Sequence, residues 1–316
     1  QVNVVMNHND YKRTGWNDKE KVLNTQNVNV NEFGKLFTRS VDDQIFAQPL
    51  VLSNFPIAGG VHNIVIVATV NNSVYAFDAD DKGKTAPYWK VNLTYNPSGF
   101  RPVKNSDMTG ACNFLPQGYS DYTGNIGIVG TPAIDTLTNT LYVLARSKSK
   151  VSEYYVQYLH AIDITTGLEK TGSPRLLEAT YPGTGRGNVN GVISFDPQKQ
   201  NQRAALLLHQ GTVYICWASH CGWGPYHGWM IGYDAATLQQ KYVYNTTPNG
   251  YGGGIWMGGQ GPSVDDDGNI LIATGNGVTG QDGNPNDTIN RAVSLIKLTP
   301  ELKVIDFFTP ANYEYL

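Results

Sequence analysis

One local pattern recurs four times along the 316-residue chain: an apolar strand, a loop, and a second strand that ends in an acidic turn. The first copy is NIVIVATVNNSVYAFDADDKGKTAPYWKVNL, and the second runs from TLYVLARSK to YLHAIDITTGLEK. The third runs from TVYICWASH to WMIGYDAATLQQKYVYN, and the fourth from NILIATGNG to AVSLIKLTPELKVIDFF, where Thr299 replaces the aspartate. Such a repeat constrains the fold more than any single motif, because each copy must be one structural unit.

A further apolar strand precedes each copy: FAQPLVLSN, GTPAIDTLT, AALLLHQG and GPSVDDDG. Each unit then has four short strands joined by turns rich in Gly, Asp, Asn and Thr, and no stretch longer than one turn has helical periodicity. Tandem four-stranded units favour an all-β fold, a β-propeller of antiparallel blades, over a sandwich or a β-solenoid. We predict four blades, at about residues 44–93, 127–178, 201–247 and 259–310.

The segment before the first unit, residues 27–42 (NVNVNEFGKLFTRSVD), reads as a lone strand. In a propeller such a strand would be the outer strand of the last blade and would close the ring. Propellers contain roughly four to eight blades. We therefore expect residues 1–316 to form a single propeller domain or the N-terminal half of a ring of about eight blades, completed by its own C-terminal half or another chain. A compact four-bladed ring is the less favoured alternative.

The composition suits a turn-rich, exported β protein. Charged residues make up only 16% of the chain, and Gly (34) and Tyr (19) are numerous. The net charge of −3 gives no reason to expect nucleic acid or an anionic membrane as a partner, and no apolar run reaches membrane-spanning length. Four Asn-x-Ser/Thr glycosylation sequons favour a secreted or extracellular protein, with the bacterial periplasm as an alternative. They lie at Asn71, Asn92, Asn245 and Asn286.

The chain has three cysteines, at positions 112, 216 and 221. Their spacing fits no zinc pattern, because no second Cys or His pair lies at ligand spacing. Cys216 and Cys221 are close enough in sequence to close a small loop as a disulfide. Ordinary buried thiols are an equally favoured interpretation.

The acidic turns carry a family resemblance. AFDADDKGKTAPYW and AIDITTGLEK resemble the Ala-x-Asp-x-x-Thr-Gly-x-x-x-Trp motif of pyrroloquinoline-quinone (PQQ) repeats, which build the eight-bladed propeller of quinoprotein alcohol dehydrogenases. Secreted bacterial PQQ-repeat-like proteins are similar over nearly the whole chain, through segments such as NQRAALLLHQGTVYICWASH and GGGIWMGGQGPSVDDDGNILIATGNG. Fold does not settle function: the same repeats build the scaffold lipoprotein of bacterial outer-membrane assembly, which looks cofactor-free.

The resemblance implies part of a cofactor site. Trp256 stands about where the dehydrogenases stack the quinone on a Trp, and Asn276 in ATGNG matches an Asn that ligates calcium. A Trp buried between blades and a turn Asn are the plain alternatives. Trp223 occupies the position of a ligating Glu, and TPANYEYL, where the catalytic Asp is expected, has only Glu314. PQQ and calcium are thus expected only if the chain is a dehydrogenase, and otherwise no cofactor is expected.

The loops between second and third strands vary most, and in a propeller they share one face. SHCGWGPYHGW carries Trp223, Tyr226 and His227, whose rings could stack on sugars or form a protein hot spot, whereas Trp229 starts a strand and is expected in the core. Arg186, in the Gly-rich connection YPGTGRGNVNG, is a candidate anion contact or a solvated loop residue. DGNPND, residues 282–287, resembles the start of a calcium loop but lacks its later ligands, which favours a polar loop.

Three functions remain open. The first is a secreted binding or structural module with a carbohydrate or protein partner on the aromatic loop face. The second is a PQQ- and calcium-dependent alcohol or sugar dehydrogenase that uses Trp256 and Asn276. The third is an architectural subunit of an extracellular assembly, whose open strand edges pair with identical copies or with neighbouring chains.

Overall fold

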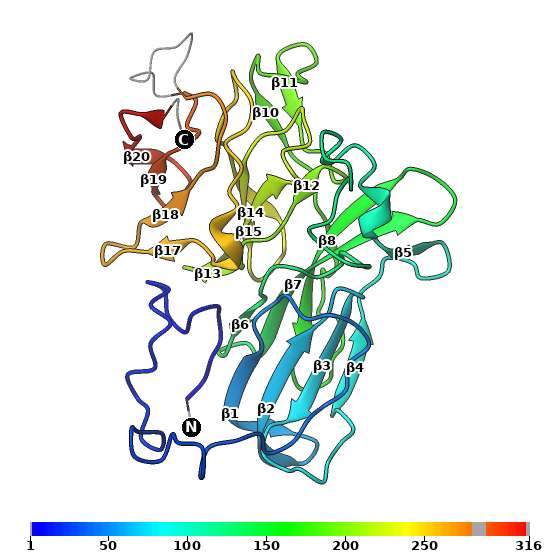
Figure 1. The fold of residues 1–316 in the computed structure, drawn as a ribbon, viewed down its shortest axis with the longest axis vertical. Coiled ribbons are helices and arrows are strands. Elements are labelled where there is room, and N and C mark those ends of the chain that lie inside the picture. Colours follow the sequence, from blue (N-terminus) through cyan, green and yellow to red (C-terminus); the bar gives the residue numbers. More distant parts are fainter. Residues whose placement is uncertain (1, 280–288, 314–316) are drawn as a thin grey trace.

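A computed structural model describes residues 2–279 and 289–313. The described residues are nearly all β, with two short 3-10 turns, η1 (Asn105–Asp107) and η2 (Met257–Gly259). No helix among the described residues is long and apolar enough to cross a membrane. The strands form four antiparallel sheets of four or five strands and one separate hairpin (Figure 1).

Each sheet corresponds to one sequence unit. The first comprises β1 (Leu50–Ile57), β2 (Gly60–Ala68), β3 (Ser73–Asp78) and β4 (Trp89–Asn92). The second comprises β5 (Phe100–Pro102), β6 (Ala133–Asp135), β7 (Thr140–Ser149), β8 (Tyr155–Asp163) and β9 (Arg175–Leu176). The third comprises β12 (Gln200–Asn201), β13 (Leu207–His209), β14 (Thr212–Ser219), β15 (Trp229–Asp234) and β16 (Gln240–Asn245). The fourth comprises β17 (Ser263–Val264), β18 (Ile270–Ala273), β19 (Leu295–Leu298) and β20 (Val304–Phe308). The hairpin joins β10 (Thr180–Pro182) to β11 (Val192–Ser194) between the second and third sheets.

The repeated aspartates end the third strand of the first three units by capping a tight turn. Asp163 Oδ1 accepts the backbone N–H groups of Thr165 and Thr166 at 2.9 and 3.0 Å. Asp78 and Asp234 make the equivalent bonds to residues two and three positions later. Short acidic side chains favour this local bonding, which stops the strand and starts the next hairpin.

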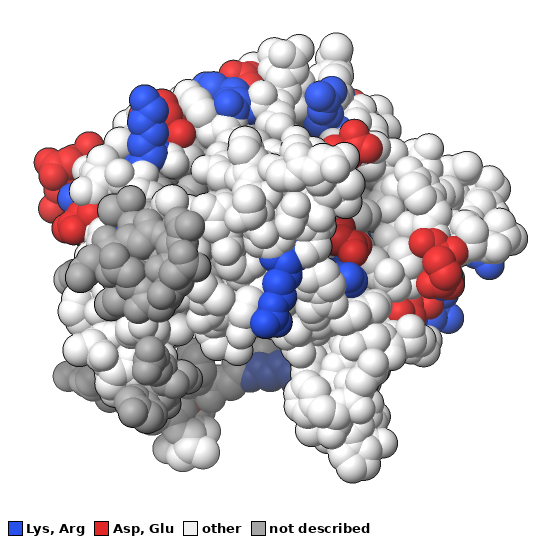
Figure 2. Space-filling view, turned by 90° about the horizontal axis from the view of Figure 1, so that it is seen from above, with Lys and Arg blue, Asp and Glu red and all other residues white. Residues whose placement is uncertain are grey.

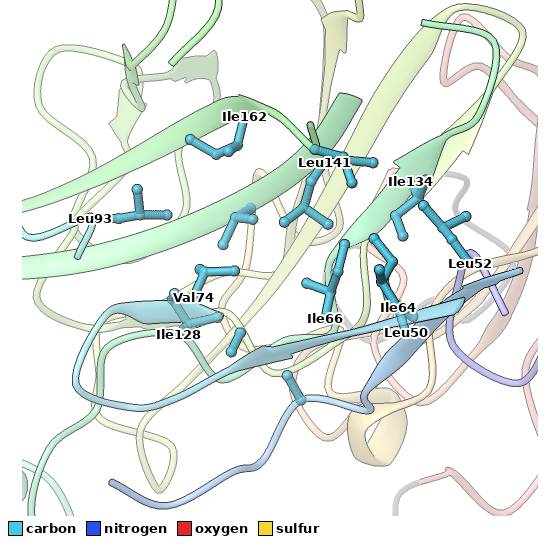
Figure 3. Close-up of a cluster of buried hydrophobic side chains, with 14 of the residues drawn as sticks. Leu50, Leu52, Ile64, Ile66, Val74, Leu93, Ile128, Ile134, Leu141 and Ile162 are labelled. Carbon is cyan, nitrogen blue, oxygen red and sulfur yellow. The ribbon is translucent and has the colours of Figure 1, made fainter. Parts of the chain in front are cut away.

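The sheets pack face to face, and each interface is a separate apolar cluster. Figure 3 shows the cluster between the first and second sheets, where Ile66 and Val74 face Leu141 and Ile162. A second cluster joins the second and third sheets around Trp217, and a third joins the third and fourth sheets. These layers confirm the predicted antiparallel four-stranded units. The number of blades in a complete ring stays a prediction.

A tryptophan of the first sheet bonds to and packs against the second sheet. The indole Nε1 of Trp89, in β4, donates to the carbonyl oxygen of Ile164 at 2.7 Å. Its ring lies on Gly167, where an added Cβ would come within 2.7 Å of the indole. Gly167 also has φ of +75°, a conformation that glycine adopts without cost. The Thr-Gly and Trp of the repeat motif are therefore partners across neighbouring sheets.

The N-terminal segment bonds to residues in or next to all four sheets. Val4 pairs with Val51 of β1, and Val5 accepts the N–H of Ile134 in β6. The buried Arg13 side chain donates to the carbonyl oxygens of Leu206 and Pro262, which immediately precede β13 and β17. This segment ties together the innermost strands.

The strand expected over residues 27–42 does not form. Asparagine side chains instead satisfy nearby backbone groups in successive turns: Asn24 and Asn27 each accept the other's N–H, and Asn29 Oδ1 accepts the N–H of Asn31. Such local bonds compete with strand pairing. The apolar side chains of the segment stay largely exposed, Val30 at 94%. Its predicted role in closing a larger ring remains a prediction.

Candidate functional site

A pocket of about 520 Å³ gathers several of the predicted residues at the end of the molecule where β10 and β11 lie. Its walls come from the β10–β11 loop, the β14–β15 loop, the glycine-rich segment before η2 and the segment that follows β18. The lining residues are Arg186, Gly187, Gly222, Gly224, Pro225, Tyr226, Tyr251 and Asn276. Figure 2 shows this end of the molecule, where charged side chains are scattered over a mostly uncharged surface.

Arg186 is held at the pocket by its backbone and by its ring contact. Its N–H donates to the Gly250 carbonyl oxygen at 2.8 Å, and Gly185 donates to Pro248 at 2.8 Å. The guanidinium lies over the Tyr251 ring, 3.7 Å from the centroid. Within the described residues no carboxylate lies within ion-pair distance of Arg186. Because stacking leaves the in-plane N–H groups of a guanidinium open, Arg186 can still pair with an anion.

His227 positions this arginine and does not line the pocket. It is buried, and its Nε2 lies 2.9 Å from the Arg186 carbonyl oxygen. Its Nδ1 lies 3.0 Å from both the carbonyl oxygen and the hydroxyl of Thr247. Burial lowers the pKa of His227, which keeps the ring neutral. The prediction that His227 itself contacts a ligand is therefore wrong: the ring has no free polar atom.

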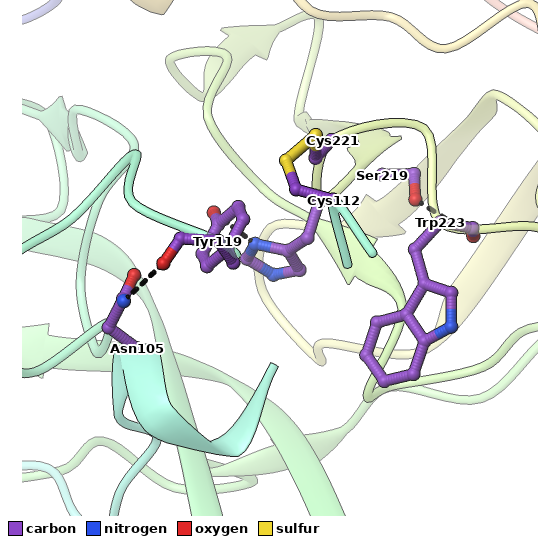
Figure 4. The surroundings of a disulfide bond; sticks show 7 residues. Asn105, Cys112, Tyr119, Ser219, Cys221 and Trp223 are labelled. Carbon is purple, nitrogen blue, oxygen red and sulfur yellow. Dashed lines mark hydrogen bonds between the residues drawn. A yellow bond between two sulfur atoms is a disulfide. The ribbon is translucent and has the colours of Figure 1, made fainter. Parts of the chain in front are cut away.

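Trp223 is also displaced from its predicted role. Its indole lies on Gly110, where an added Cβ would come within 2.2 Å of the ring. Its carbonyl oxygen accepts the Ser219 hydroxyl at 3.1 Å (Figure 4). Trp223 thus packs against the loop between β5 and β6 and is absent from the pocket wall. Tyr226 does line the pocket, with its side chain mostly buried, and Trp229 lies in the core as expected.

The disulfide joins Cys112 to Cys221, with Cα atoms 5.4 Å apart, and not Cys216 to Cys221 (Figure 4). The predicted pairing is wrong because Cys216 lies within β14. Cys216 pairs with Met230 in the β14–β15 ladder and is buried in the cluster between the third and fourth sheets, whereas Cys221 follows the strand and bonds to Cys112. Cys216 is a fully buried free thiol whose pKa is raised by burial, as the alternative interpretation expected.

Trp256 and Asn276 lie near each other, but they do not form a calcium site. Added Cβ atoms on Gly254 and Gly275 would both come within 3.0 Å of the Trp256 indole, so its edge packs on these glycines. Asn276 is exposed at the pocket, and its carbonyl oxygen accepts the Gly253 N–H at 2.8 Å. The described residues include no group of three or more His, Cys, Asp or Glu side chains arranged to hold a metal. One amide cannot replace a set of carboxylate ligands, so these residues do not fit a calcium ion.

The sequons differ in accessibility. Asn92 is exposed and Asn71 is half-buried, with its Nδ2 donating to Asp42 at 3.0 Å. Asn245 is 1% exposed, at the end of β16, so it has no room for a glycan and its prediction is corrected. Asn286 and the candidate calcium loop at residues 282–287 lie outside the described residues, as does Glu314.

The fold of the chain matches solved structures, although its sequence matches no family model. No protein-family model and no curated protein matches the sequence. The quinohemoprotein alcohol dehydrogenase ADHIIG from Pseudomonas putida HK5 matches with a TM-score of 0.62 at 16% identity, over 97% of this chain and 40% of that one. The chain has the propeller fold of quinoprotein dehydrogenases.

Two further dehydrogenases support the same fold. The quinohemoprotein alcohol dehydrogenase from Comamonas testosteroni has a TM-score of 0.58 at 15% identity, over 97% of this chain and 41% of its own. A europium-containing methanol dehydrogenase has a TM-score of 0.57 at 15% identity, over 97% of this chain and 48% of its own. The chain therefore spans less than half the length of each. The resemblance stated from the sequence is confirmed for the fold.

Tyr251 is the pocket residue that sequence reasoning missed. It precedes the glycines Gly252 to Gly254, whose N–H and carbonyl groups bond to Tyr226, Asn276 and Gly275. These glycines allow the close backbone approach that places Tyr251 beside Arg186 and Asn276. An aromatic residue directly before a glycine run was the available signal.

Proposed function

We propose that the chain is a secreted binding module whose pocket at Arg186 takes an acidic saccharide. One observation carries the proposal: the exposed Arg186 guanidinium, which has no carboxylate partner among the described residues, is stacked on Tyr251 at a pocket of about 520 Å³ that Asn276 also lines. This volume is within the usual range for small-ligand sites. Arginine pairs with carboxylates through two parallel hydrogen bonds, which suits the acid group of a uronic sugar.

The remaining wall suits the sugar ring. Pro225 and Tyr226 contribute apolar surface, against which the C–H face of a pyranose can pack. The Asn276 amide both donates and accepts, so it can bond a ring hydroxyl. The glycines on the wall leave backbone accessible to the ligand.

Titration calorimetry with uronic-acid oligosaccharides tests this proposal. We expect the wild type to bind these sugars and Arg186→Met to bind them at least tenfold more weakly, a loss of about 1.4 kcal/mol in binding free energy. Neutral oligosaccharides of equal length should bind little. Arg175→Met, which removes an exposed arginine of β9 outside the pocket, is the matched control and should bind like wild type. Equal affinity for acidic and neutral sugars, or no effect of Arg186→Met, would remove this function.

A quinone-dependent dehydrogenase is the second candidate, supported by the fold and by Trp256 lying beside Gly275 and Asn276. Its residues for calcium are incomplete in the described chain, so we assign no step to the cofactor. The test is to add PQQ and calcium and to record the near-ultraviolet spectrum and dye reduction with alcohols or sugars. A chain that neither retains the quinone nor reduces the dye is not such an enzyme.

We also propose that residues 1–316 form part of a ring of about eight blades. The outward side of the fourth sheet leaves Leu271, Leu295 and Phe308 exposed, at 37%, 58% and 62%. In a complete ring such a face packs against the next blade, supplied by the same chain or by another copy. Two measurements on the native protein distinguish these arrangements: the mass of its polypeptide and the sedimentation of the protein in solution. A longer polypeptide that sediments as a monomer indicates a ring closed by the same chain, and a dimer indicates a ring closed by another copy. A monomer of the present length indicates an isolated subunit of an extracellular assembly.

A further inference from the structure

A fully buried arginine lies between the second and third sheets, away from the Arg186 pocket. Arg146, in β7, is 1% exposed. Its Nη2 donates to the Gln198 carbonyl oxygen at a long 3.3 Å, and its Nε and Nη1 have no hydrogen-bond partner in the described chain. A buried charged group without partners is costly, because it has lost its hydration and gained nothing in return.

His220 adds a second unpaired donor beside it. The His220 backbone N–H donates to the carbonyl oxygen of Lys199, the residue after Gln198, so the Arg146 guanidinium and the His220 backbone bond to neighbouring carbonyl groups. Its Nδ1 lies 2.6 Å from the Tyr119 hydroxyl. Burial raises the pKa of Tyr119 and lowers that of His220, so the phenol donates to Nδ1 and the ring proton sits on Nε2. That Nε2–H is buried and has no acceptor in the part of the chain that the structure describes.

No carboxylate of the described chain compensates this charge. None lies within ion-pair distance of Arg146. The nearby buried Asp107 is already bound by Arg101 at 2.7 Å and lies 3.4 Å from Lys148. Lys148 also pairs with Glu153 at 2.6 Å, so these two carboxylates already have cationic partners, and the charge of Arg146 stays without an ion-pair partner among the described residues.

We propose that a small monovalent inorganic anion of about chloride size binds between Arg146 and His220. The anion would accept from Arg146 Nε or Nη1 and from His220 Nε2, and it would neutralise the charge of Arg146. Tyr119 and Tyr122, both less than 8% exposed, cover the place, which excludes larger ligands. They belong to the loop that the Cys112–Cys221 disulfide fixes to the third sheet. The anion is thus a structural ligand joining two sheets.

Anomalous diffraction from crystals of the wild-type protein in sodium bromide tests the site directly. We expect a bromide peak within hydrogen-bond distance of the Arg146 guanidinium and His220 Nε2. Density that refines as water at this place, while bromide occupies other sites, would overturn the proposal. This measurement needs no variant, so a failure of Arg146 variants to fold does not leave the proposal untested.

Thermal unfolding in solution gives the second test. At constant ionic strength, replacing gluconate by chloride should raise the unfolding midpoint, and the unfolding equilibrium constant should fall about elevenfold at ten times the chloride Kd. Arg146→Met should lose this response, whereas Arg175→Met, an exposed arginine in the second sheet, should keep it. An equal chloride response in wild type and Arg146→Met would contradict the site.

Discussion

The contact between Trp89 and Gly167 gives the sharpest test of how the sheets are joined. Gly167→Ala should destabilise the protein through two separate effects. An alanine at φ of +75° costs about 1–2 kcal/mol. Its Cβ would also come within 2.7 Å of the Trp89 ring and push it away, which breaks the 2.7 Å bond from Nε1 to Ile164. Loss of that bond and its packing costs about another 1–2 kcal/mol.

Gly211→Ala separates these two effects. Gly211 has φ of +69°, but an added Cβ there meets no atom within 4 Å, so only the backbone cost applies. We expect urea unfolding to show about 2–4 kcal/mol lost for Gly167→Ala and about 1–2 kcal/mol for Gly211→Ala. In a Trp89→Ala background, Gly167→Ala should lower the free energy of unfolding no more than Gly211→Ala does. The ring that the added Cβ would meet is then absent, so the effects of the two substitutions at this contact are not additive. Equal losses of unfolding free energy for the two glycine variants in the wild-type background would refute the proposed role of the Trp89–Gly167 contact.

Three further predictions concern the disulfide, the repeat aspartate and the sequons. Peptide mapping without reduction should find Cys112 linked to Cys221 and Cys216 free, and a Cys216–Cys221 peptide would contradict the structure. Cys112→Ser should lower the free energy of unfolding by about 4–5 kcal/mol, because the loop that the disulfide closes is long. Burial raises the pKa of Asp78, but the N–H of Asp81, the Tyr88 hydroxyl and the N–H of Asp80 outweigh it and lower the pKa from 3.8 to about 2. The stability from Asp78 is therefore present above pH 4 and lost as the pH falls towards 2, and Asp78→Asn should show a smaller loss across that window in acid-unfolding curves. Expressed in a glycosylating host, Asn245→Gln should change the mass only by the methylene group that the substitution adds, and a mass decrease of one glycan would show that this strand end is accessible.

The architecture was predictable because several independent sequence signals recur in each repeat. The aspartate that ends a strand, the glycine after it and the apolar alternation all indicate the same four-stranded unit. The segment at residues 27–42 misled for a local reason: alternation of Val and Asn matches a strand, but the Asn side chains form turns instead.

The site was only partly predictable. Arg186, Tyr226 and Asn276 were each identified singly, from a glycine-rich loop, an aromatic loop and a family motif. That they share one pocket depends on the packing of three segments far apart in sequence, which periodicity does not reveal. Trp223 and His227 carried the same aromatic signal, yet Trp223 packs on Gly110 and His227 bonds to Arg186 and Thr247. The Cys112–Cys221 bond, 109 residues apart, was hidden for the same reason.

The central claim is that the Arg186 pocket recognises an acid group on a sugar. A crystal structure of the protein soaked with a uronic-acid disaccharide tests it most directly. We expect the carboxylate to lie in the plane of the Arg186 guanidinium at hydrogen-bond distance, with the sugar ring against Pro225 and Tyr226. A disaccharide bound elsewhere, or an empty pocket at a concentration that saturates binding in solution, would contradict the account.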